Sequence, residues 1–115
     1  MSSLSISACA MELPLVHLFK IARGEEAIAR TAVVRVRTAD LEGIGEATPI
    51  ERYGESVESV IAYFQAHPLA CDDPFRLESL LHAEIPASAR AGLDLALHDL
   101  IGKELGKPLY ALLGL

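Results

Sequence analysis

The fold is decided by residues 87–113, which read ASARAGLDLALHDLIGKELGKPLYALL. Apolar side chains in this stretch recur every three to four residues, the spacing that places them on one face of an α-helix. They are Leu93, Ala96, Leu97, Leu100 and Ile101. The stretch therefore predicts one amphipathic helix whose apolar face packs against the rest of the domain.

Both ends of this helix are marked in the sequence. Ser88 is the expected N-cap, because a serine oxygen can accept from a free backbone amide of the first turn. Gly106 and Pro108 mark the end, since glycine adopts a left-handed conformation easily and proline cannot continue a helix. The first half of the helix is rich in alanine and also contains Gly92, so we expect a second backbone to approach it closely there.

Three strands are expected before the helices. Alternation of apolar and polar residues predicts strands over residues 4–13 and 27–38, and a turn at 40–43 leads into a third strand over 44–48. In the second strand Ala32, Val34 and Val36 share one face. Residues 15–26 keep neither the period of a helix nor that of a strand, so we expect a long loop there.

Helical spacing returns after a second irregular segment at residues 49–54. A helix is predicted over 55–66, Asp73-Pro74 is typical of the start of a shorter helix that carries Leu77, and residues 108–113 suit one or two helical turns. The predicted fold class is α+β, a three-stranded antiparallel sheet followed by a helical bundle. We expect a single domain over residues 1–115.

Composition excludes several kinds of partner. The formal net charge is −6 and the ten basic residues are scattered, whereas a nucleic-acid surface needs clustered Lys and Arg. No apolar run approaches the roughly 18 residues of a membrane span. Cys9 and Cys71 lack metal-binding spacing, and the N-terminus is unlike a secretory signal. We expect a cytoplasmic protein with no nucleic-acid or membrane partner.

No spacing in the chain predicts a catalytic residue or a metal ligand. Asp94 and His98 are four residues apart on the predicted helix, which favours a local hydrogen bond. Glu46 has the chemistry of a general base, but no partner is placed near it by the sequence. Gly43 and Gly45 lack the following helix of a dinucleotide site and suit turn geometry or close backbone approach.

The two irregular segments, 15–26 and 49–54, combine apolar, aromatic and cationic residues. Such a mixture lines a pocket for a small acidic or amphipathic ligand, or it is ordinary loop packing; composition leaves both open. The candidate binding residues are Phe19, Ile21, Arg23, Ile50, Arg52 and Tyr53.

Three motifs resemble the N-terminal capping domain of the enolase superfamily, in its mandelate racemase/muconate lactonizing enzyme branch. They are GIGEATP at 43–49, YGES at 53–56 and the run from AGLDLALHDL to GKPLYALLG at 91–114. The segment FKIARG at 19–24 is similar to that of dipeptide epimerases. The resemblance covers nearly the whole chain and implies the same α+β fold.

The resemblance also implies a partner, a C-terminal (β/α) barrel of roughly 250 residues that this chain lacks. In such enzymes three barrel carboxylates hold Mg²⁺ and barrel lysines remove and return the proton α to a carboxylate. The cap closes the barrel mouth with two loops. Here Phe19 and Ile21 would form an apolar wall, Arg23 or Arg52 would pair with a remote carboxylate, and Tyr53 would stack or hydrogen-bond.

By this resemblance the chain is the substrate-capping and specificity domain of a Mg²⁺-dependent isomerase, a dipeptide epimerase, inactive without its barrel. Its substrate would be a dipeptide or small carboxylate. Two alternatives stay open: the cap of a muconate cycloisomerase or o-succinylbenzoate synthase relative, and a stand-alone binding module without enzyme activity. A homo-oligomer is also left open.

Overall fold

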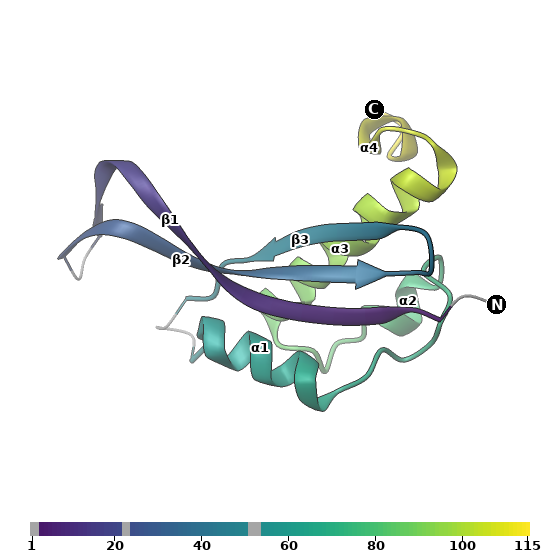
Figure 1. The fold of residues 1–115 in the computed structure, drawn as a ribbon, viewed down its shortest axis with the longest axis horizontal. Helices are drawn as coiled ribbons and strands as arrows, with labels where there is room; N and C mark the ends of the chain where they lie inside the picture. Colours follow the sequence, from purple (N-terminus) through teal and green to yellow (C-terminus); the bar gives the residue numbers. More distant parts are fainter. Residues whose placement is uncertain (1–2, 22–23, 51–53) are drawn as a thin grey trace.

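The computed structural model describes residues 3–21, 24–50 and 54–115, with the backbone alone for 15–21 and 24–29. It confirms the α+β prediction, with strands first and helices after them (Figure 1). The elements are β1 (Ser5–Ile21), β2 (Gly24–Arg37), β3 (Glu42–Ala47), α1 (Val57–Ala66), α2 (Leu77–Leu80), α3 (Ala87–Leu105) and α4 (Leu109–Leu112).

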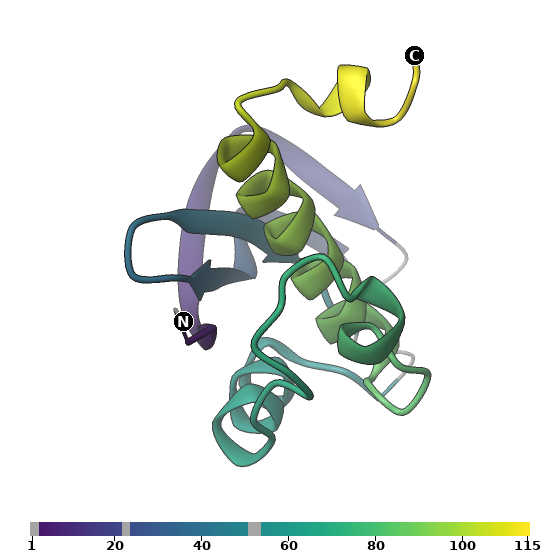
Figure 2. The ribbon, with the colours of Figure 1, turned by 90° about the vertical axis from the view of Figure 1, so that its right-hand side faces the viewer.

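The sheet is antiparallel with strand order β1-β2-β3, and β2 lies in the middle. The predicted inward face of β2 is confirmed, because Ala32, Val34 and Val36 are fully buried while Arg37 on the other face is exposed. That inward face shares one hydrophobic core with α1 and α3. Figure 2 shows α4 and the C-terminus at the opposite end of α3 from α1.

α3 packs on β3 at backbone distance. A β-carbon placed on Gly43 would lie 2.1 Å from the carbonyl oxygen of Ala96, and one on Gly45 would lie 2.2 Å from that of Gly92. Only residues without a side chain fit between a strand and a helix at this separation. The predicted close approach is confirmed, and it lets the leucines of α3 reach across to β2.

The prediction of a loop over residues 15–26 is wrong. β1 continues to Ile21 and β2 begins at Gly24, with Phe19 opposite Glu26. We call residues 14–21 and 24–28 the hairpin arm; Figure 1 shows it projecting beyond the body of the sheet. Alternation marks a strand only where one face is buried, and the arm leaves the core. The register also shifts between Pro14 and Phe19, where proline has no amide to donate.

Two predicted helix starts are also wrong. Ser88 is not the N-cap of α3: Pro86 holds that position, and the Ser88 hydroxyl is buried with no hydrogen-bond partner among the described residues. Asp73 does not begin α2 either, because its carboxylate accepts from the Phe75 amide in a turn before the helix. In both cases the residue that precedes the helix is not the one that the local sequence suggested.

Within residues 3–21, 24–50 and 54–115, no helix combines the length and the apolar character that a membrane crossing requires.

Candidate functional site

The described parts of the two segments that carry the predicted binding residues lie at the same end of the sheet. Ala47, where β3 ends, pairs with Ala32, and the hairpin arm begins four residues before Ala32, where Ile28 pairs with Pro14. The chain therefore leaves β3 beside the base of the arm (Figure 1). Register alone brings together two segments that are more than 20 residues apart in the sequence.

The six candidate binding residues differ in what the structure places. Phe19 and Ile21 belong to β1 within the hairpin arm, where their backbones pair with Glu26 and Gly24. Ile50 follows β3 and is 48% exposed. The other three, Arg23, Arg52 and Tyr53, lie outside the described residues. Binding by any of the six stays a prediction.

Arg30 connects three elements at the base of the arm. Its Nη1 donates to Glu58 Oε1 of α1 at 2.7 Å, and its Nε lies 3.8 Å from Glu12 Oε1 of β1. Arg30 lies on β2 directly opposite Glu12, two residues after the β2 part of the arm ends at residue 28. The hydrogen bond from Arg30 holds the pKa of Glu58 below its usual value and, conversely, raises the pKa of Arg30.

Glu55 holds the other segment. Its Oε1 accepts a hydrogen bond from the backbone amide of Ser88 at 3.1 Å. That amide lies in the first turn of α3, where backbone donors lack helical partners and a negative charge is favourable. Glu55 follows Gly54, so the carboxylate fixes the downstream end of segment 49–54 against α3.

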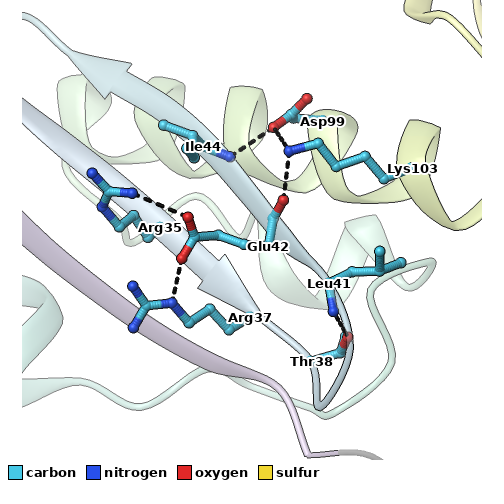
Figure 3. Close-up of polar contacts among 8 residues, drawn as sticks. All are labelled: Arg35, Arg37, Thr38, Leu41, Glu42, Ile44, Asp99 and Lys103. Atoms are coloured by element: carbon cyan, nitrogen blue, oxygen red, sulfur yellow. Dashed lines mark hydrogen bonds and ion pairs between the residues drawn. The ribbon is translucent and has the colours of Figure 1, made fainter.

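A second polar cluster lies at the far end of β2 and β3 (Figure 3). Glu42 pairs with Arg37 through Nε and with Arg35 Nη1 at 3.0 Å, and the hydrogen bond from Arg37 chiefly holds its pKa below the usual value. Asp99 Oδ2 accepts from the Ile44 amide at 2.9 Å and from Lys103 Nζ at 3.0 Å. This cluster ties the edge of β3 to α3 and contains no residue of either binding segment.

Neither cluster supplies a metal centre. Among the residues that the structure describes, no three His, Cys, Asp or Glu side chains are grouped so that they could hold a metal ion. The predicted local contact on α3 is confirmed, because His98 Nδ1 lies 2.8 Å from Asp94 Oδ1. His98 therefore already has a partner on its own helix.

An open groove of about 740 Å³ runs between β3, α3 and the start of α4. Its walls combine apolar side chains such as Ile44, Leu95 and Leu109 with polar ones such as Glu46 and His98. None of its described lining residues belongs to segments 15–26 or 49–54.

The sequence pattern did not single out Arg30, Glu55 or Glu58. A strand register that places Glu12 opposite Arg30 would have indicated the contact between those two residues. No spacing indicates the contact of Glu55 with the Ser88 amide, because the two residues are 33 positions apart.

Comparison with known proteins gives matches to one enzyme family. The family model described as "Mandelate racemase / muconate lactonizing enzyme, N-terminal domain" matches residues 5–114. The L-Ala-D/L-Glu epimerase of Bacteroides thetaiotaomicron is 36% identical over 110 residues, which cover 90% of this chain and 29% of that protein. The chloromuconate cycloisomerase of Cupriavidus pinatubonensis is 32% identical over 116 residues, covering 90% and 31%.

Among solved structures, the dipeptide epimerase from Enterococcus faecalis V583, complexed with Mg and the dipeptide L-Leu-L-Tyr, superposes with a TM-score of 0.81. It is 30% identical, and the match covers 98% of this chain and 34% of that chain. The chain therefore spans about a third of the length of the relatives it matches.

Proposed function

The chain belongs to the mandelate racemase/muconate lactonizing enzyme family as its N-terminal domain, and from this premise we propose that it is the substrate-capping and specificity domain of a dipeptide epimerase. The observation that carries the proposal is the match of 98% of this chain to one third of a dipeptide epimerase that binds a dipeptide. Epimerisation removes the proton α to a carboxylate and returns one on the opposite face.

The described residues do not fit a Mg²⁺ site. Mg²⁺ prefers carboxylate oxygens in octahedral geometry, and no described group of three suitable side chains exists here. In the proposal, the metal ligands and the proton-transferring groups belong to the barrel.

What remains for the cap is to bind the distal part of the substrate and to exclude water. The hairpin arm and segment 49–54 are suited to this, because β3, which leads into that segment, ends beside the base of the arm. In the proposal Phe19, Ile21 and Ile50 provide apolar contact, Tyr53 stacks, and Arg23 or Arg52 pairs with a remote carboxylate of the dipeptide.

The proposed partner of the cap is the barrel domain. Large apolar side chains are exposed along α4, where Leu109, Tyr110 and Leu113 are 43%, 63% and 56% accessible. They adjoin the groove, of which Leu109 is a wall. Gathered apolar exposure of this kind is typical of an interaction surface. We propose that the barrel covers α4 and the groove.

A second candidate is the cap of a cycloisomerase, favoured by the 32% identity to the chloromuconate cycloisomerase. The two candidates differ in substrate, since a dipeptide carries an amide and a side chain beyond the reacting centre and a muconate does not. A panel of both substrate classes therefore separates them.

The test joins this chain to the barrel of the Enterococcus faecalis epimerase, in place of that enzyme's own cap. We expect the chimera to epimerise dipeptides with Mg²⁺ and to leave muconates unchanged. Turnover of muconates in preference to dipeptides would favour the second candidate. A folded chimera that turns over neither, beside an active parent enzyme, would contradict the capping role.

A further inference from the structure

We propose that residues 55–58, which we call the α1 junction, position both binding segments of the cap: Glu58 holds the base of the hairpin arm through Arg30, and Glu55 holds the downstream end of segment 49–54 on α3. The contacts stand on the structure alone. Their significance for substrate binding rests on the proposed function. Glu55, Glu58 and Arg30 are positioning residues, because they act through the segments they hold.

The α1 junction is itself fixed by a reciprocal pair of hydrogen bonds. Ser56 Oγ accepts from the Ser59 amide at 3.0 Å, and Ser59 Oγ accepts from the Ser56 amide at 2.9 Å. This capping box satisfies two amides that a helix start leaves without partners. Val57 and Val60 anchor the same turn in the core. A carboxylate on this turn therefore starts from a fixed backbone.

Arg30 is placed where it controls the direction of the arm. Between Pro14 and Phe19 the strand ladder loses its regular register, so the arm is not held in line by continuous pairing. Arg30 lies two residues from this irregularity, on the side of the core, and joins β2 to α1 through Glu58, with Glu12 of β1 nearby. Of the ion pairs among the described residues, the two that Arg30 forms lie at the base of the arm.

Glu55 performs the equivalent task on the second segment. The peptide between Gly54 and Glu55 is the point where segment 49–54 returns to the body of the domain, and the contact with the Ser88 amide is made directly after it. The same contact supplies α3 with an acceptor at its first turn, where Pro86 provides no side-chain cap. One turn of chain thus joins the arm, segment 49–54 and the start of α3.

The first test measures amide hydrogen exchange in this chain, residue by residue. Glu58→Ala and Arg30→Met remove the contact, Arg30→Lys retains a charge, and Arg37→Met removes a matched ion pair at the other end of β2. We expect arm amides such as Lys20 and Glu25 to exchange about two- to fivefold faster in the first two variants, the range an exposed pair supports. Arg30→Lys should restore part of the protection.

For Glu55 the matched variants are Glu55→Ala, Glu55→Gln and the exposed control Glu84→Ala. The Ser88 amide should exchange several-fold faster in Glu55→Ala, while Glu55→Gln keeps an oxygen acceptor and most of the protection. An unchanged arm in Glu58→Ala, or equal acceleration by Arg37→Met, would overturn the role of Glu58. An unchanged Ser88 amide in Glu55→Ala would overturn that of Glu55.

The second readout uses the chimera with the barrel. Glu58→Ala should raise KM for a dipeptide about two- to fivefold at unchanged kcat, because the arm binds but does not react. An equal loss in kcat would contradict a positioning role. The two failures are distinguishable, since an inactive chimera counts against the proposed function and leaves the exchange result to decide the role of the α1 junction.

Discussion

Gly45 of β3 and Gly92 of α3 lie so close that a β-carbon on Gly45 would be 2.2 Å from the Gly92 carbonyl oxygen. The Gly92 oxygen belongs to the main chain and the position of a β-carbon is fixed by the backbone of Gly45, so neither can rotate aside as the end of a flexible side chain would. The separation between the sheet and its longest helix is therefore set by residues that have no side chain.

The first prediction concerns this contact. Gly45→Ala should lower the free energy of unfolding by about 3 kcal/mol or more, because the added methyl forces the strand and the helix apart. Urea unfolding followed by circular dichroism measures the change. Glu46→Ala, at the exposed neighbouring position on β3, should stay within about 0.5 kcal/mol of wild type. Equal stability of Gly45→Ala and wild type would refute the packing account.

The second prediction concerns the edge of β3. Asp99→Ala should cost about 1 kcal/mol of unfolding free energy, because the Ile44 amide loses its acceptor and Lys103 loses its partner. Exchange of the Ile44 amide should accelerate with it. Glu104→Ala, exposed on the same helix, serves as the control. Unchanged protection of Ile44 would show that α3 does not cover the strand edge.

The third prediction concerns pH. The pKa of Glu42 is lowered in the folded state, chiefly by the hydrogen bond from Arg37. Its contribution is therefore complete above the unfolded pKa near 4.5 and is lost as pH falls through the lower folded value. The urea midpoint should decline as the pH falls below the unfolded pKa of Glu42, and Glu42→Gln should flatten this decline. High salt should weaken the effect, since the ion pairs are exposed. A decline equally steep in Glu42→Gln would contradict this assignment.

The fourth prediction concerns substrate choice. In the chimera, Arg23→Ala and Arg52→Ala should reduce the preference for acidic over neutral dipeptides, because the cap then lacks a cation for the remote carboxylate. The ratio of kcat/KM for the two substrate classes measures it. Arg76→Ala, on the described body of the domain, is the control. Unchanged discrimination in both variants would remove these arginines from the proposed site.

The helix face of α3 and the inward face of β2 could be predicted because each element buries one side only. Leu93, Leu97 and Leu100 recur at helical spacing, and Val34 and Val36 alternate, since burial imposes those periods on the sequence. The close approach at the glycines of β3 could also be predicted, because only a residue without a side chain lets another backbone come so near.

The hairpin arm escaped prediction because its pairing is made by backbone groups outside the core. Its sequence therefore shows no alternation between residues 15 and 26. The true partner of the α3 start also escaped, since Glu55 and Ser88 are 33 residues apart and a serine at a helix start suggested a local cap. Contacts between distant residues follow from register and packing, which a local pattern does not contain.

The central claim is that this chain caps a barrel that carries the reacting groups. Its most direct measurement is deuterium uptake at the α-carbon of a dipeptide in D₂O with Mg²⁺, compared among this chain, the relative's barrel and the two joined. The account predicts stereochemically inverting exchange at a much higher rate for the joined protein than for either part. Exchange by this chain alone, or a barrel that works equally well without it, would contradict the claim.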